Sequence, residues 1–232
     1  MEFLTNKMFL IAVTFIAFAM AQMIQRRIGW KVLNPILVSI VLIICFLTFA
    51  HIDYGTYRAS GEYIDFWLKP AVVARGVPLY KQLTSIRKQM VPLLIAEMSG
   101  CVAGIISVVL CARMLGASQE IIMSLAPKAV TTPIAMEVSA SVGGIPALTA
   151  AVVVCTGIFG GMAGFRIIRM GRVHSPMAEG LSMGTAAHAI GTSVAMERSD
   201  RYGAFSSLGL TLNGLLTALL SPLILHLLGY AV

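Results

Sequence analysis

The chain has 232 residues and a formal net charge of +7, and 58% of its residues are hydrophobic while only 12% are charged. Soluble domains carry about a quarter charged residues, so this composition excludes a soluble globular protein and predicts an integral membrane protein. The basic residues stand in short stretches between apolar runs, which is typical of membrane proteins rather than of nucleic-acid binding. We therefore expect the lipid bilayer to surround this chain and nucleic acid to be no partner.

Several apolar runs are long enough to cross a bilayer as helices, because about 20 residues span the hydrocarbon core. Within the first run, Ala19-Met20-Ala21 is similar to a signal-peptide cleavage site. The pair Arg26-Arg27 directly afterwards, and the later spans, favour a first helix that is retained. The runs are Met8 to Ile24, Leu33 to Ala50, Val91 to Leu115, Ile145 to Phe165 and Gly203 to Leu228.

The interval after the second run is the most polar of the chain. His51 to Asp65 mixes charges of both signs with tyrosines, which suits a segment in the headgroup region. We assign it to the outer face of the membrane. The following stretch, Phe66 to Tyr80, is short for a span and contains Pro70 and Pro78, so it predicts a broken helix.

Three basic clusters lie between the runs, and the positive-inside rule places all three in the cytoplasm. If every apolar stretch crossed the membrane once, the third cluster would lie on the opposite face from the other two. The conflict disappears if Ile121 to Ser139 enters and leaves by the same face as a re-entrant hairpin; a broken helix that crosses the membrane is the alternative. The clusters are Arg26, Arg27 and Lys31; Lys81, Arg87 and Lys88; and Arg166, Arg169 and Arg172.

One stretch of the chain occurs twice, since Ala126 to Ser139 returns as Ala186 to Ser199. Chance rarely aligns Thr-x-x-Ala-Met-Glu-x-Ser twice, so the pair indicates a duplicated structural unit. A cationic or titratable residue stands at the same place in both copies, as Lys128 and His188. The identical positions are Ala126/Ala186, Ala129/Ala189, Thr132/Thr192, Ala135/Ala195, Met136/Met196, Glu137/Glu197 and Ser139/Ser199.

The repeat organises residues 1–232 as a single membrane domain. Residues 1–52 hold the N-terminal helices, and residues 53–115 hold the outer-face segment, the broken helix and a span. Residues 118–168 combine a hairpin with a span, and residues 176–228 are a second, inverted copy of that unit. The predicted fold class is an all-α polytopic membrane protein, with a transporter-like inverted repeat of discontinuous or re-entrant helices.

The chemistry of the repeat predicts an anion site. Broken helices present free N–H groups and a positive dipole end, and non-helical backbone at membrane depth is tolerated where it lines a wet cavity. Lys128 offers a permanent charge, and an imidazole such as His188 takes up a proton near neutral pH. We predict that a small carboxylate is held between these two segments, with hydroxyl donors from Thr131, Thr132, Thr185 and Thr192.

Ionisable groups at membrane depth are costly and usually functional, so we expect proton uptake at His188 or Glu97 to accompany the substrate. The plainer alternatives are a snorkelling Lys128, a structural His188 and a Glu97 near the headgroups. The secondary candidates are Arg75, Glu137, Glu197 and Asn213. Their alternatives are an inner anchor for Arg75, caps or partners of Arg198 and Arg201 for the two glutamates, and interhelical bonding for Asn213.

The cysteines show no spacing typical of a metal or redox site. We interpret them as small hydrophobic residues rather than as disulfide partners or metal ligands. We predict no enzymatic activity, no cofactor and no metal for this chain. The four cysteines are Cys45, Cys101, Cys111 and Cys155.

The repeated stretches and the residues around them resemble the LrgB/CidB family of bacterial inner-membrane proteins, which includes YohK and the C-terminal half of the plant chloroplast glycolate/glycerate transporter. The resemblance covers nearly the whole chain from about Leu33. A departure lies at Leu68 to Tyr80, where Lys69 stands in place of a glycine and Arg75 in place of an apolar residue. The most specific elements are Pro127 to Glu137, Gly143 to Ala150, Thr156 to Gly160 and Gly184 to Thr192.

The resemblance implies two functions. One is transport of small monocarboxylates such as glycolate, glycerate or pyruvate, which we expect to be proton-linked. The alternative is a holin/antiholin-like control of murein hydrolase export and autolysis, together with a small membrane partner of the LrgA/CidA type. The duplicated hairpins favour transport, because a lesion-forming protein does not require them. We further expect a location in the bacterial inner membrane and, from the glycine-rich helix faces, a homodimer.

Overall fold

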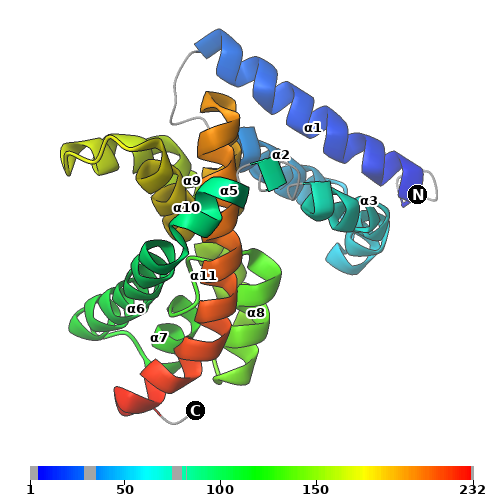
Figure 1. Cartoon of the computed structure of the whole chain (residues 1–232). Helices are drawn as coiled ribbons and strands as arrows, with labels where there is room; N and C mark the ends of the chain where they lie inside the picture. The colour runs from blue at the N-terminus through cyan, green and yellow to red at the C-terminus, as the bar shows by residue number, and fades with distance from the viewer. Residues whose placement is uncertain (1–4, 29–34, 75–79, 82, 231–232) are drawn as a thin grey trace. The chain divides into compact units, whose positions relative to one another are not determined.

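The computed structural model describes residues 5–28, 35–74, 80–81 and 83–230, and within them the chain is helical and contains no strand (Figure 1). Four of the described helices are long and apolar enough to cross a membrane, namely α1, α6, α9 and α11. This confirms the predicted all-α, polytopic fold class. The chain divides into two compact units, residues Met1–Ala74 and Arg75–Val232, a boundary that falls inside the segment 53–115 of the sequence analysis.

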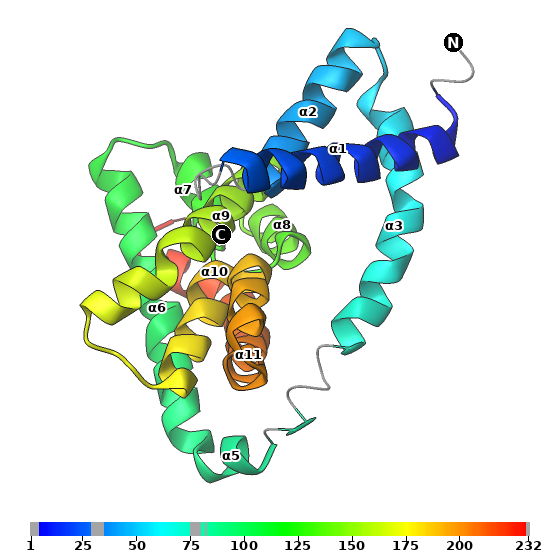
Figure 2. The same cartoon turned by 90° about the horizontal axis from the view of Figure 1, so that it is seen from above.

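The first unit consists of three helices, α1 (Lys7–Ile28), α2 (Pro35–Phe49) and α3 (Tyr54–Ala74). Figure 2 shows α1 lying across the other two. The Thr14 hydroxyl lies 2.9 Å from the hydroxyl of Tyr57 in α3, and the ring of Phe9 lies 6.3 Å from that of Phe46 in α2. Most apolar side chains of α1 are exposed in the unit, as expected for a helix in lipid.

The second unit holds the repeat. The helix starts follow local signals: the Ser118 hydroxyl accepts from Ile121 N at the start of α7, and prolines stand in the first turns of α8, α9 and α10, where their missing N–H costs nothing. The elements are α5 (Leu83–Lys88), α6 (Met90–Met114), α7 (Gln119–Leu125), α8 (Thr132–Ser141), α9 (Pro146–Met170), α10 (Pro176–Arg198) and α11 (Asp200–Leu227).

The helices α7 and α8, with the turn 126–131 between them, fold back on each other and form a hairpin, here called hairpin 1. The Thr149 hydroxyl lies 2.7 Å from the Ser139 hydroxyl of α8 and 2.9 Å from the Ser124 carbonyl oxygen of α7. The Ser124 hydroxyl also accepts from Ile145 N at 2.7 Å, just before α9 begins. The two arms therefore leave by the same end, as the re-entrant prediction requires.

The helix α10 is also a hairpin, here called hairpin 2, because it breaks at His188, where φ is 42° and ψ is −133°. Arg198 Nη1 near its end lies 3.5 Å from Glu179 Oε2 near its beginning. In one continuous helix these residues would stand about 28 Å apart. Met183 and Ala195, one from each arm, also share a buried cluster with Phe165 of α9.

The two hairpins approach the middle of α11 from opposite ends. Ile122 and Met123 of hairpin 1 pack with Ile224 and Leu225 near the end of α11, whereas Leu181 of hairpin 2 packs with Phe205 and Leu208 near its beginning. In Figure 1, α7 and α8 accordingly flank the C-terminal part of α11, and α10 lies beside its N-terminal part. This arrangement supports the predicted inversion of the second repeat relative to the first.

The same packing brings two of the basic clusters to one end of the second unit. Leu93 near the start of α6 joins the buried cluster of Leu181 and Phe205, and Phe165 near the end of α9 contacts Tyr202 edge to face at 5.7 Å. The start of α6 and the end of α9 thus lie at the end of the unit where α11 begins. The clusters flanking them, Lys81 to Lys88 and Arg166 to Arg172, share that end.

Candidate functional site

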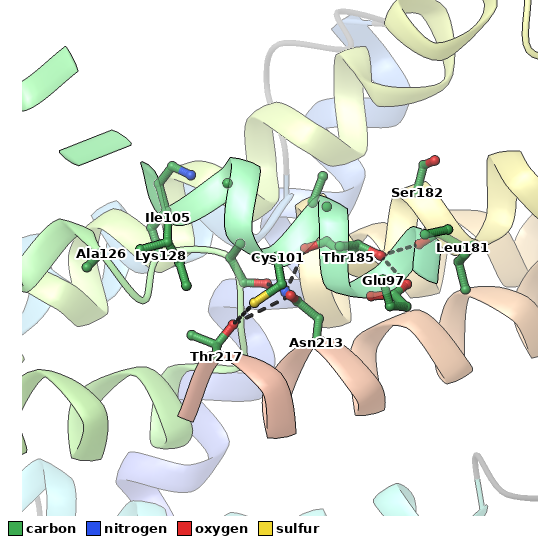
Figure 3. Close-up of a pocket in the computed structure, with 15 residues that line it drawn as sticks. Glu97, Cys101, Ile105, Ala126, Lys128, Leu181, Ser182, Thr185, Asn213 and Thr217 are labelled. Carbon is green, nitrogen blue, oxygen red and sulfur yellow. Dashed lines mark hydrogen bonds between the residues drawn. The ribbon is translucent and has the colours of Figure 1, made fainter. Parts of the chain in front are cut away.

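A cavity of about 310 Å³ lies where the two hairpins, α6 and α11 meet (Figure 3). Each element contributes one face of the wall, and the polar groups come from all of them. This volume is at the lower end of the range for small-molecule sites. The lining residues are Ala96, Glu97, Gly100, Cys101, Gly104 and Ile105 of α6; Ala126, Lys128 and Ala129 of the hairpin 1 turn; Leu181, Ser182, Thr185 and Ala186 of α10; and Asn213 and Thr217 of α11.

The cationic residue of the cavity is Lys128, in the turn of hairpin 1. Pro127 before it and Pro133 after it prevent one continuous helix from running through this stretch, and the Lys128 backbone N–H bonds to Leu125 O at 3.1 Å. Its side chain is half-buried. Among the hydrogen bonds and ion pairs of the described residues, none uses its ammonium group, which leaves that group available to a ligand.

An acidic group, Glu97 of α6, lines the same cavity and is 0% exposed. Its Oε1 atom lies 2.5 Å from the hydroxyl of Thr185 on hairpin 2. Its Oε2 atom is buried and has no hydrogen-bond partner among the described residues. In Figure 3, Cys101 and Asn213 lie between Lys128 on one side and Glu97 on the other.

Asn213 joins the tips of the two hairpins. Its side-chain Nδ2 donates to Ala129 O in hairpin 1 at 3.1 Å and to Thr185 O in hairpin 2 at 2.9 Å. Its Oδ1 atom accepts from Thr217 at 3.5 Å, and the Thr217 hydroxyl lies 3.4 Å from Cys101 Sγ. Both donor hydrogens of the amide are therefore used for bonds between elements, and the interhelical-bonding alternative for Asn213 is the one that this geometry supports.

The structure places His188 away from the cavity, although it stands at the tip of hairpin 2. The imidazole is 4% exposed, and its Nε2 atom lies 2.9 Å from Val153 O of α9. Gly157 of α9 makes room for the ring, since a side chain at that position would clash with His188 Cε1 and Nε2. The cavity is thus lined by the Lys128 segment and the first arm of hairpin 2, and the His188 imidazole is not part of its wall.

Of the four predicted threonines, Thr185 alone lines the cavity. The Thr192 hydroxyl donates to His188 O at 2.9 Å and accepts from the Ser206 hydroxyl at 3.0 Å, so it stabilises the bend of hairpin 2. Thr131 immediately precedes α8 and Thr132 begins it. Both are half-buried, and neither belongs to the cavity wall.

Of the secondary candidates, Asn213 lines the cavity, whereas the two glutamates do not. Arg75 lies outside the described residues. Glu137 and Glu197 are exposed and line no part of the wall. The suggested pairing of Glu197 with Arg198 is replaced by another: the buried carboxylate of Glu179 accepts from Arg169 Nε at 3.3 Å and lies 3.5 Å from Arg198 Nη1.

Three polar groups of the cavity were missed by the sequence analysis. The sequence predicts Cys101 only as a small hydrophobic residue, and it does not single out Ser182 or Thr217. The spacing of Ser182 and Thr185 is a signal that predicts a shared helix face, and both line the cavity. Among the described residues, no group of three or more His, Cys, Asp or Glu side chains is placed to hold a metal ion.

Comparison with known proteins identifies relatives along most of the chain. Residues 14–227 match the model of the LrgB-like family. The uncharacterized protein YxaC of Bacillus subtilis (strain 168) is 34% identical over 218 residues, covering 94% of this chain and 95% of the relative. The antiholin-like protein LrgB of Bacillus cereus (strain B4264) is 32% identical over 220 residues, covering 94% and 96%.

The antiholin-like protein LrgB of Bacillus anthracis (strain CDC 684 / NRRL 3495) is similar to the same extent, with 32% identity over 220 residues. No solved structure matches the chain. The family match covers the whole of hairpin 1 and hairpin 2 and all four candidate membrane spans except the first residues of α1. The chain is therefore a multi-pass membrane protein that belongs to the LrgB-like family.

Proposed function

We propose that the protein is a secondary carrier that moves a small anion of the monocarboxylate class across the membrane through the cavity at Lys128. The single observation that carries the proposal is the meeting of two oppositely directed hairpins at a cavity whose ammonium group has no partner among the described residues. Inverted pairs of broken helices that meet near the midplane are typical of secondary transporters.

The chemistry of the wall suits a small carboxylate. Lys128 supplies the charge that an anion needs, and the hydroxyl of Ser182 supplies a neutral hydrogen-bond donor. The rest of the wall is mainly Ala, Gly, Leu and Ile, and its other polar residues are Glu97, Cys101, Asn213 and Thr217. A cavity of about 310 Å³ favours a ligand of few heavy atoms, such as pyruvate, glycolate or glycerate.

The arrangement also provides a route for alternating access. Lys128 belongs to hairpin 1 and Thr185 to hairpin 2, and Asn213 of α11 bonds to both tips. A relative movement of the two hairpins would open the cavity toward one end of α11 or toward the other. The positive-inside rule assigns the end with Lys81, Arg87 and Arg166 to the cytoplasm of a bacterial inner membrane.

A second candidate is an antiholin-like role in controlling murein hydrolase export and autolysis, with a small membrane partner of the LrgA/CidA type. The observation that favours it is the name of several relatives, which are antiholin-like proteins. Those names speak for this role more directly than for transport. A homodimer is compatible with either function.

Purified protein in liposomes separates the two functions. A carrier gives saturable uptake of radiolabelled pyruvate, glycolate or glycerate while an entrapped fluorescent dye is retained. The variant Lys128→Met should require a much higher substrate concentration for the same uptake, whereas the exposed position Glu120, changed to Gln, serves as the matched control. Release of the dye without saturable uptake would overturn the carrier and favour a lesion-controlling role.

A further inference from the structure

The hydroxyl of Thr185 has more contacts than it has hydrogens. Its Oγ1 atom lies 2.5 Å from Glu97 Oε1 and 2.8 Å from the carbonyl oxygen of Leu181. A hydroxyl donates one hydrogen, and the carbonyl oxygen can only accept. If Thr185 donates to Leu181 O, as threonines in helices often do one turn back, the hydrogen in the contact with Glu97 has to come from Glu97.

The surroundings of Glu97 also favour a neutral acid. Its Oε2 atom is buried without a hydrogen-bond partner among the described residues, and no ion pair of those residues includes it. A buried carboxylate without compensation costs far more free energy than a buried carboxylic acid. Glu97 is therefore accommodated as an acid that donates through Oε1 to Thr185.

The backbone of α11 closes this part of the cavity. A side chain at Gly209 would lie 2.6 Å from Leu181 O, 2.9 Å from Glu97 Oε1 and 3.1 Å from Thr185 Oγ1. Glycine thus lets α11 cover the carboxyl group with bare backbone. The site of the acid is built from three elements, α6, α10 and α11.

The other charged groups around Glu97 are few. Within the cavity, the titratable side chains besides Glu97 are Cys101 and Lys128, and the wall residues of α10 and α11 are neutral. Glu179 of α10 is paired with Arg169 and Arg198, and Asp200 of α11 is paired with Lys81. The helix α5 before α6 carries Arg87 and Lys88, both exposed.

We propose that Glu97 holds a proton in this conformation, and that this proton accompanies the anion bound at Lys128. The second half rests on the proposed function, whereas the first half does not. On ionisation, the O–H bond of Glu97 breaks, the proton passes through the cavity to water, and Thr185 turns its hydroxyl from Leu181 O to Glu97 Oε1. The carboxylate then repels an anion in the same cavity, so proton and anion favour each other's binding.

Infrared spectroscopy of the native protein at neutral pH tests the first half. A carbonyl stretching band of a protonated carboxylic acid should be present, should be absent in Glu97→Gln, and should remain in the exposed control Glu120→Gln. In Thr185→Val the band should move to higher frequency, because its hydrogen-bond acceptor is lost. A spectrum that Glu97→Gln leaves unchanged would overturn the assignment, and so would a band that Thr185→Val does not shift.

Transport in liposomes tests the second half, with radiolabelled pyruvate as the probe. Glutamine imitates the neutral acid, so Glu97→Gln should retain exchange of pyruvate across the membrane but lose its accumulation under an imposed pH gradient. Accumulation equal to that of the native protein, or loss of exchange and accumulation together, contradicts the proposal. If the native protein moves no monocarboxylate, the carrier function fails, while the infrared result still decides the protonation of Glu97.

Discussion

The two hairpins contain the two copies of the repeated sequence, yet they present their tips in different ways. Hairpin 1 turns through residues 126–131 between two short helices and leaves Lys128 half-buried at the cavity. Hairpin 2 turns at the single residue His188, with φ 42°, and buries its ring against α9. The first tip thus offers a group to a ligand, whereas the second forms part of the packed scaffold.

Glycines account for much of this difference. Gly157 of α9 lies against the ring of His188, and Gly160 against Ala187, so the tip of hairpin 2 can approach α9 closely. Gly184 in the same hairpin lies against the backbone of α11. The turn of hairpin 1 contains no glycine; Pro127 lies within it and Pro133 in the first turn of α8, and Lys128 and Ala129 remain half-buried.

The largest effect is expected from Gly184→Ala, which tests the close packing of hairpin 2. The added Cβ atom would clash with Ser206 O and would lie 2.8 Å from Leu210 N, and a rigid backbone cannot yield. We expect a loss of roughly 3 kcal/mol of folding free energy, measured as a lower midpoint of thermal unfolding in detergent. Gly104→Ala is the control, because nothing lies within 4 Å of its Cβ position; equal midpoints would refute the contact.

Lys128→Met is expected to have the next largest effect, and it acts on ligand binding rather than on stability. A hydrogen bond to a charged group contributes about 1.5–3 kcal/mol, so the apparent affinity for pyruvate should fall about 10- to 100-fold. The concentration dependence of uptake into liposomes measures this loss. An unaltered affinity in a folded variant would show that Lys128 does not bind the ligand. The proposed difference in function between the two hairpin tips would then be wrong.

Variants of His188 test whether the tip of hairpin 2 has a structural role. A β-branched residue is strained at positive φ, whereas asparagine tolerates it. His188→Val should therefore lower the unfolding free energy by about 1–3 kcal/mol, and His188→Asn by clearly less, as thermal unfolding of both would show. His188→Asn should also leave the pH dependence of uptake unchanged. A shifted pH profile in that variant would return His188 to the transport mechanism.

Asn213→Ala should give the smallest effect, because it removes the two bonds to the hairpin tips and one long contact of 3.5 Å with Thr217. Interhelical hydrogen bonds in membranes average about 0.6 kcal/mol, so two of them contribute about 1 kcal/mol. Thermal unfolding should detect a small decrease relative to Ser193→Ala, whose exposed hydroxyl bonds only within its own helix. A midpoint identical to that of the control would mean that the tips are joined without Asn213.

Much of the architecture was predictable from the sequence, because hydropathy and repeated motifs are local properties. The spans α6, α9 and α11 begin and end within a few residues of the apolar runs, and the break at His188 lies within the second copy of the repeat. The positive-inside rule predicted that the basic clusters Lys81 to Lys88 and Arg166 to Arg172 lie at the same end of the second unit. The structure has them at one end, because the chain between α6 and α9 folds as hairpin 1. The division of the chain between Ala74 and Arg75 was not predicted, since the prolines of Phe66 to Tyr80 indicated a broken helix rather than a boundary between units.

The amino-acid sequence by itself determined a helical membrane protein with two related hairpins and a cation at the first tip, because periodicity, hydropathy and charge suffice for those features. Only the tertiary structure decided which tip groups face the cavity. The direction of the His188 ring depends on one positive φ and on space left by Gly157, and Glu97 meets Thr185 only after α6 and α10 have packed together. Such contacts depend on residues distant in the chain, which local sequence patterns do not encode.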